Sequence, residues 1–282
     1  MVDLRREDLT REASEARSRF PALLDHARTP ESLISLFAQY LHFNSPFGAG
    51  VSGLAGEVAA REDLFCDRAE PMSLMADKSG DVASEIFYAA LGEFAERRNS
   101  SPSHRRLAAL MLREVGNVFR IPAARMAELT VASRGVLASA AKVRDGYGLN
   151  QELTEAKIFQ AIGFHIGSEI LADQEFAALD RFLRDRFGEL VARLEAATLF
   201  DDGGRLNAYS YVRIHTVVEA DHFDAALSSA NNALRYYAGT TSQEDLKTQV
   251  LRGFRLFATL QEEFCAVAVP VASSDAKIRS AT

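Results

Sequence analysis

The stretch His215-Thr-Val-Val-Glu219-Ala-Asp-His222 places three side chains that can bind a metal ion at positions i, i+4 and i+7. At about 100° per residue, these positions fall within roughly 60° of one another on a helix. The surrounding residues 206–237 contain neither Pro nor Gly and therefore predict one long helix. In a chain of this composition such a pattern is expected by chance only about 0.02 times. This favours a metal-binding face over the alternative, a surface face whose histidines merely titrate.

The composition is typical of a soluble globular protein. With 282 residues, of which 48% are apolar, the chain can bury a core as one large domain or two small ones. No apolar run approaches the roughly 20 residues of a membrane span, and no signal peptide is evident, so we expect a cytoplasmic protein with no membrane partner. The net charge of −7 disfavours nucleic acid as a partner. Cys66 and Cys265 are too few for a disulfide framework.

Helical patterns cover most of the remaining chain. Start and stop signals such as Thr29-Pro30 and Asn99-Ser-Ser-Pro-Ser103 separate them, and single helices are expected over 82–98, 123–144, 152–172 and 175–198, with a kink or loop at 44–50. Strand-like alternation and internal repeats are absent from the sequence. We therefore predict an all-α protein, a single compact helical bundle. Its expected parts are an N-terminal helical extension at 1–28, the bundle at 29–267 and a disordered tail at 268–282.

A second polar stripe lies within the apolar residues 158–172. His165, Glu169 and Asp173 follow one another at i, i+4 and i+8 and line up along one face of the predicted helix. A carboxylate buried among such apolar residues must be paired or bound to a metal. The alternative is a stripe that faces water.

A third candidate pair is formed by Glu93 and His104, on either side of the Ser/Pro run. In an unbroken helix the two residues would lie about 16 Å apart, too far to share one metal ion. Only a reversal of the chain at residues 99–103 would bring them together.

In chain order, these motifs resemble one family. They are Glu93 followed by a break and His104-Arg-Arg-Leu, then Gly163-Phe-His-Ile-Gly-Ser-Glu169-Ile-Leu-Ala-Asp173, then His215-x3-Glu219-x2-His222. Over residues 37–237 they are similar to the heme-oxygenase-like diiron oxidases and oxygenases, the CADD-type group of iron-containing redox enzymes. Two features depart from the family pattern. Glu219 stands where Asp is usual, and the spacing from Glu93 to His104 is longer.

The resemblance implies a heme-oxygenase-like helical fold that binds two Fe(II) ions per chain and uses O2 as a co-substrate. It implies six metal ligands: Glu93, His104, Glu169, His215, Glu219 and His222. Such a mixture of oxygen and nitrogen donors suits Fe(II) or Mn(II) and leaves positions open for O2. We expect His165 and Asp173, on the stripe that carries Glu169, to lie behind the ligands and support them.

The predicted function is that of an O2-dependent nonheme diiron oxidase or oxygenase. Its substrate is expected to be a small amine- or amino-acid-type metabolite, with N-oxygenation favoured over oxidative C–C bond cleavage. An external reductant and a homodimer are compatible with this function. Two alternatives stay open: a heme-binding or heme-degrading enzyme with His26 or His42 as axial ligand, and a metal-free interaction protein on the same scaffold. The aromatic side chains predicted to line a substrate pocket, with plain core as the alternative, are Phe87, Phe164, Tyr209 and Tyr211.

Overall fold

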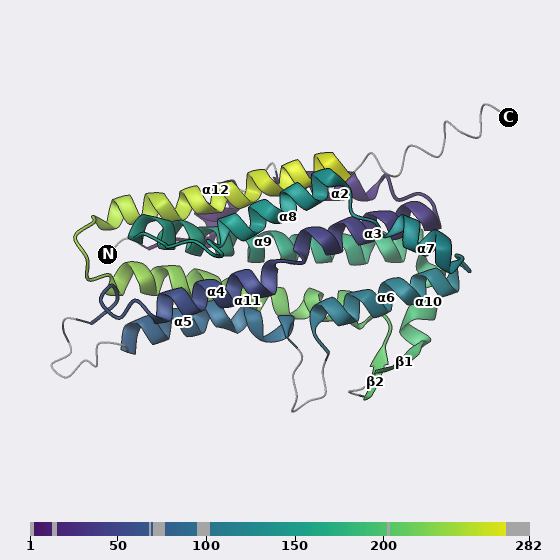
Figure 1. Cartoon of the computed structure of the whole chain (residues 1–282), viewed down its shortest axis with the longest axis horizontal. Coiled ribbons are helices and arrows are strands. Elements are labelled where there is room, and N and C mark those ends of the chain that lie inside the picture. Colours follow the sequence, from purple (N-terminus) through teal and green to yellow (C-terminus); the bar gives the residue numbers. More distant parts are fainter. Residues whose placement is uncertain are drawn as a thin grey trace.

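The computed structural model of the chain describes residues 3–12, 16–67, 69, 77–94, 102–201 and 204–268. Within these ranges almost every element is a helix, which confirms the predicted all-α bundle (Figure 1). The first half contains α1 (Arg6–Glu12), α2 (Ala16–Leu24), α3 (Pro30–Asn44), α4 (Phe47–Ala59), α5 (Asp77–Ala90), the 3-10 turn η1 (Leu91–Glu93), α6 (His104–Val118), α7 (Ala123–Leu129) and α8 (Arg134–Gly146). The second half contains α9 (Glu155–Arg186), α10 (Gly188–Ala196), the strands β1 (Thr198–Asp201) and β2 (Gly204–Asn207), α11 (Ser210–Tyr236) and α12 (Gln243–Ala268).

The long helix α9 is the centre of the bundle. It packs along both α12 and α11, and α11 in turn packs against α5. In Figure 1 these helices run close to the long axis of the molecule, with α12 along the upper edge and α5 along the lower one. The backbones of α9 and α12 meet at two glycines. A Cβ on Gly163 would collide with the carbonyl of Val250, and one on Gly253 with the carbonyl of Gln160, so only glycine permits this contact.

Cap residues begin two helices where the sequence predicts them. At the start of α3, Thr29 accepts a hydrogen bond from the N–H of Ser32, the hydroxyl of Ser32 accepts one from the N–H of Thr29, and Pro30 occupies the first turn. Ser103 caps α6 by accepting a hydrogen bond from the N–H of Arg106. Residues 95–101, which precede this cap, lie outside the described residues.

Several boundaries differ from those predicted. The helix expected over 175–198 is interrupted at residue 187, between α9 and α10, and the α-helix expected over 82–98 ends at residue 90. The helix expected over 123–144 is split into α7 and α8, because Ser133 caps α8 and Gln39 holds the intervening turn by accepting from the N–H of Ser133 and donating to the carbonyl of Val131. The break expected between 172 and 175 is absent. No Gly or Pro interrupts that stretch, and α9 continues for 32 residues. The interruption expected over 44–50 is confined to residues 45 and 46.

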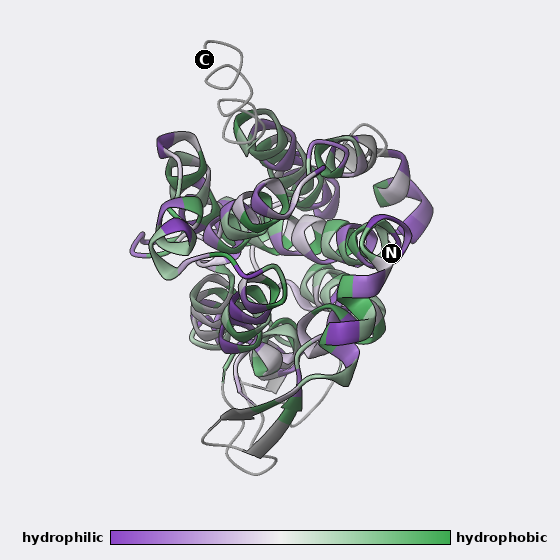
Figure 2. Cartoon of the chain, turned by 90° about the vertical axis from the view of Figure 1, so that its right-hand side faces the viewer, coloured by the Kyte–Doolittle hydropathy of each residue, from purple (hydrophilic) through white to green (hydrophobic). Residues whose placement is uncertain are grey.

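The predicted N-terminal extension is in contact with the bundle. Both α1 and α2 pack against α12, and α2 also packs against α9. Apart from Ala268, the predicted tail lies outside the described residues. In the end-on view of Figure 2, hydrophobic residues lie mainly between the helices and hydrophilic ones on the outer faces, and the antiparallel hairpin of β1 and β2 projects from one edge.

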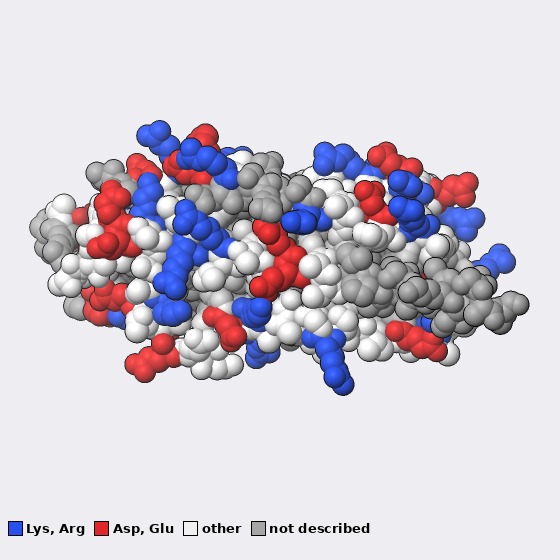
Figure 3. All heavy atoms as spheres, turned by 90° about the horizontal axis from the view of Figure 1, so that it is seen from above, with Lys and Arg blue, Asp and Glu red and all other residues white. Residues whose placement is uncertain are grey.

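Charged residues of both signs are interspersed on the face seen in Figure 3, without a broad area of either sign. Across the described ranges, the helices all lack the combination of length and apolar character that a membrane span requires.

Candidate metal centre

The six side chains expected as metal ligands all line one cavity of about 1050 Å³. They come from four elements: Glu93 from η1, His104 from α6, Glu169 from α9, and His215, Glu219 and His222 from α11. Their ligand atoms form two groups, each with its atoms within 4.8 Å of one another. The first group is Glu93, His104 and His215, and the second group is Glu169, Glu219 and His222.

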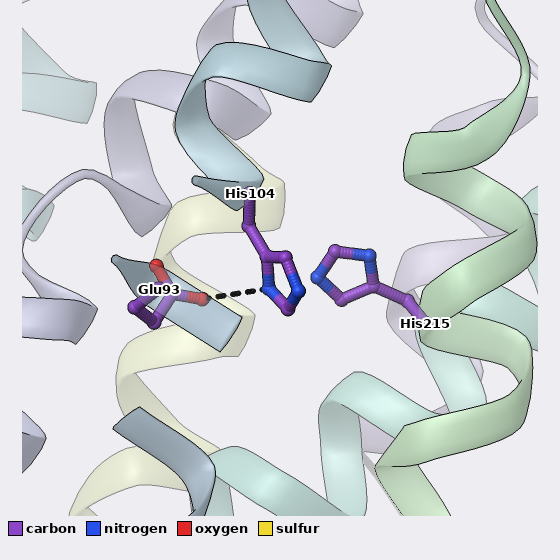
Figure 4. Close-up of side chains that lie close together, drawn as sticks. All are labelled: Glu93, His104 and His215. Atoms are coloured by element: carbon purple, nitrogen blue, oxygen red, sulfur yellow. Dashed lines mark hydrogen bonds and ion pairs between the residues drawn. The ribbon is translucent and has the colours of Figure 1, made fainter. Parts of the chain in front are cut away.

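In the first group, side chains from three elements converge (Figure 4). Nδ1 of His104 lies 3.2 Å from Oε1 of Glu93, and the centroids of the His104 and His215 rings are 4.2 Å apart. η1 ends at Glu93 and α6 begins at His104, and the two side chains meet instead of lying about 16 Å apart as in an unbroken helix.

Gly92 lets His104 reach Glu93. The imidazole of His104 packs directly on the backbone of η1, where a Cβ on Gly92 would collide with Cε1 and Nε2 of the ring. On α4, a Cβ on Gly48 would come within 2.9 Å of the Cβ of Glu93. Neither glycine stands out in the sequence, although Gly92 directly precedes a candidate ligand. Both keep the space in which the carboxylate and the imidazole meet.

The orientation of His215 leaves one of its ring nitrogens available to a metal ion. Nδ1 lies 2.6 Å from the backbone oxygen of Tyr211, so the N–H at Nδ1 donates there and Nε2 carries the lone pair. The ring also stacks on Phe176, with centroids 4.0 Å apart and an interplanar angle of 16°. Burial, and then the neighbouring His104, lowers the pKa of His215 well below its usual value. A neutral and fixed imidazole is the form that binds metal ions.

Glu219 stands between the two groups. Its Oε1 lies 3.7 Å from Nε2 of His215 in the first group, and its Oε2 lies 3.5 Å from Nδ1 of His222 in the second. The same nitrogen of His222 lies 3.7 Å from Oε2 of Glu169. The two oxygens of this carboxylate thus face one imidazole of each group, and it could help to hold a cation in either.

The carboxylates that line the cavity require neutralisation of their charge. Within the described residues, Glu93, Glu169 and Glu219 have ion-pair partners only among the histidines. Burial, and then the charge of Glu219, raises the pKa of Glu169 well above its usual value. Burial, and then the charge of Glu93, raises the pKa of Glu219 to about 8. Buried carboxylates of this kind must be protonated or neutralised by a cation. Oxygen and nitrogen donors in two groups fit two divalent ions of the Fe(II) or Mn(II) type.

A hydrogen-bonded network lies behind Glu169. Nδ1 of His165 is 3.2 Å from Oε1 of Glu169, and the hydroxyl of Tyr147 is 3.3 Å from the same nitrogen and 2.8 Å from the hydroxyl of Ser168. His165 is fully buried, and burial, followed by the charge of His222, lowers its pKa to about 3. Tyr147 belongs to the end of α8, on another part of the chain, so the pattern on α9 does not reveal it.

Asp173, also expected behind the ligands, takes no part in this network. It is half-buried one turn beyond Glu169, and no hydrogen bond to another described residue involves it, although its charge contributes to the raised pKa of Glu219. Among the aromatic residues expected to line a pocket, Tyr211 borders the cavity. The other three are placed elsewhere, Phe87 on the surface and Phe164 and Tyr209 in the core.

The two histidines considered as axial heme ligands occupy different surroundings. His42 borders the cavity, with Nε2 3.0 Å from the carbonyl oxygen of Thr130. His26 is exposed beyond the end of α2. A heme iron bound at His42 would have to displace this contact if it used Nε2.

Comparison with known proteins places the fold. No protein family model matches the chain. No curated protein sequence matches it either. Among solved structures, that of a TenA homolog from Pseudomonas syringae pv. tomato superposes with a TM-score of 0.53 at 10% sequence identity, over 93% of this chain and 92% of that chain. The two proteins share a fold. This agrees with the predicted all-α helical bundle.

Proposed function

We propose that this protein is an O2-dependent nonheme diiron oxidase or oxygenase acting on a small metabolite. N-oxygenation of an amine is the favoured reaction, and oxidative C–C bond cleavage is the alternative. The observation that carries the proposal is the position of Glu219, with one carboxylate oxygen toward His215 and the other toward His222. Glu219 would therefore help to hold a pair of metal ions, together with an imidazole from each group. The motif resemblance favours iron among the metals that these donors suit.

The side chains of the protein would hold and orient such a centre. When bound, the two Fe(II) ions would reduce and activate O2, and O2 would supply the oxidising equivalents for the reaction. The carbonyl of Tyr211 fixes the ring of His215, and the contacts of His165 fix Glu169. The walls of the cavity include apolar side chains such as Leu112 and Phe257, which keep bulk water away from the reacting atoms.

Anaerobic titration with Fe(II), followed by metal analysis, tests this function. We expect saturation at about two Fe(II) per chain, and O2 consumption with loss of Fe(II) when air is admitted. Parallel titrations with Mn(II) and Zn(II) measure the metal preference. Added heme should give no Soret band, which separates the proposal from the heme alternative. Failure to bind Fe(II) would instead support the metal-free alternative.

A further inference from the structure

The cavity contains one more buried carboxylate, Glu175, which belongs to neither metal-binding group. Its side chain borders the cavity, and the residue is 6% exposed. Oε2 accepts a hydrogen bond of 2.6 Å from the hydroxyl of Tyr40 on α3. Among the described residues, no donor reaches Oε1. The carboxylate is therefore held in place by one oxygen and leaves the other available to a ligand.

Three aromatic residues neighbour this carboxylate: Tyr40 donates a hydrogen bond to it, Phe176 follows it in the chain, and the charge of Glu175 acts on Tyr211. The ring of Phe176 lies 5.9 Å from that of Tyr40 and 5.5 Å from that of Tyr211, and all three residues border the cavity. Within the described part of the chain, the hydroxyl of Tyr211 makes no hydrogen bond and so remains available as an acceptor. Aromatic faces beside a carboxylate are the surroundings that proteins use to bind ammonium groups.

No positively charged side chain of the described residues acts on Glu175. The charged group that acts on it is another carboxylate, Glu219, and no Lys or Arg of the described residues pairs with it. Burial accordingly raises the pKa of Glu175 to about 8, with a further contribution from the charge of Glu219. An ammonium ion would provide both the missing charge and the missing hydrogen-bond donors, whereas an anionic ligand would add to the repulsion.

We propose that Glu175, Tyr40 and Tyr211 form a subsite that binds the ammonium group of an alkylamine substrate. This subsite borders the first metal-binding group, because Phe176, the residue after Glu175, stacks on His215 with ring centroids 4.0 Å apart. The inference rests on the proposed oxidase function for the statement that the bound amine is the substrate. The binding itself depends only on Glu175 and the aromatic residues around it.

Isothermal titration of the full-length chain with n-butylamine, n-butanol and butyrate tests the subsite. The titrations are made anaerobically, on the metal-free protein and on protein supplied with Fe(II). We expect n-butylamine to bind at least about tenfold more tightly than either of the other two compounds. Glu175→Gln keeps the shape of the side chain and the hydrogen bond from Tyr40 but cannot ionise when the ammonium group binds, so it should weaken butylamine binding at least about tenfold and leave butanol binding unchanged.

Two further variants provide a second test and a control. Tyr40→Phe should weaken butylamine binding less than Glu175→Gln, because the carboxylate remains. Glu189→Gln changes an exposed carboxylate on α10 and should bind butylamine like wild type. The far-ultraviolet circular dichroism of each variant verifies that it folds. Equal butylamine binding by wild type and Glu175→Gln, a preference for butyrate, or no amine binding in either form would overturn the subsite. Failure of the Fe(II) titration with amine binding intact would overturn the oxidase function alone.

Discussion

The imidazole rings of His104 and His215 lie with their centroids 4.2 Å apart and an interplanar angle of 59°, although one begins α6 and the other belongs to the second turn of α11. Both residues are buried, and no hydrogen bond joins the two rings. As cations the two imidazoles would repel each other, whereas a metal ion shared by their nitrogens would turn the contact into a stabilising one. The first prediction therefore concerns the ligands on α11.

His215→Ala should empty the first metal-binding group and leave the second, and His222→Ala should do the reverse. Each variant should bind about one Fe(II) per chain in place of about two. His26→Ala, which removes an exposed histidine beyond α2, is the matched control and should bind iron like wild type. Metal analysis after anaerobic titration measures the stoichiometry. Full iron occupancy in both α11 variants would contradict the assignment of these ligands.

Changes at Glu219 should distinguish the effect of its charge from that of its length. Glu219→Gln keeps the size of the side chain but withdraws the negative charge placed between the groups, so Fe(II) affinity should fall by about 10- to 100-fold. Glu219→Asp keeps the charge, so iron should still bind while the rate of O2 consumption changes. Competition with a chelator measures the affinity. If the Gln variant binds Fe(II) as wild type does, Glu219 is not a ligand.

The network behind Glu169 should affect turnover more than metal content. His165→Ala and Tyr147→Phe each loosen the support of this carboxylate, and we expect retained iron with turnover slowed by about 10- to 100-fold. Tyr209→Phe is the control, because it removes a buried hydroxyl that donates to Asp180 instead. Steady-state O2 consumption and metal analysis are the measurements. Loss of iron from His165→Ala would show that His165 acts as a ligand itself.

Gly92→Ala should displace His104, since the new methyl group would occupy the position of the imidazole. We expect a loss of about 1–3 kcal/mol in the free energy of unfolding and reduced Fe(II) binding in the first group. Gly80→Ala in α5 is the control, because its methyl group would meet nothing within 4 Å. Urea denaturation and Fe(II) titration of both variants make the comparison. Wild-type iron binding by Gly92→Ala would show that His104 does not need this close approach.

The stability of the metal-free protein should depend on pH through Glu175. The pKa of Glu175 is about 8 in the folded chain, and the unperturbed value of 4.5 applies to the unfolded chain. Between pH 4.5 and pH 8 the folded chain therefore keeps a proton that the unfolded chain releases. The contribution of Glu175 to the free energy of unfolding should therefore fall as pH rises, by at most about 1.4 kcal/mol per unit, and level off above pH 8.

Glu175→Gln is neutral at every pH and lacks this contribution, while Tyr40 and Glu219, which face the group, are present in both proteins. The stability of the variant relative to wild type should increase from about pH 5 to about pH 8. Urea denaturation across this range measures the difference. Parallel pH profiles would mean that the carboxylate is ionised in the folded chain throughout.

Much of the secondary structure could be predicted because helical spacing and caps are local properties. The absence of Pro and Gly predicts α11, and Thr29-Pro30 predicts the start of α3. The turn between α7 and α8 could not be predicted in this way. It is held by Gln39, a residue 94 positions before the N–H of Ser133 that it binds. Contacts between distant segments decide such boundaries, and a local pattern does not contain them.

Helical spacing indicates the candidate ligands on α9 and α11, whereas Glu93 and His104 are named as ligands only through the family resemblance. The grouping of the six could not be predicted. His215, Glu219 and His222 share one face of α11, yet the fold places His215 with Glu93 and His104, and the other two with Glu169. That division follows from the packing of α9 and α6 against α11.

The subsite at Glu175 depends on tertiary structure in the same way. Its partner Tyr40 lies 135 residues earlier in the chain, and nothing in the spacing of either helix relates the two. Sequence periodicity determines which side chains share a face of a helix, since that follows from 3.6 residues per turn. Only the packing of several helices, driven by burial of their apolar faces, determines what that face meets.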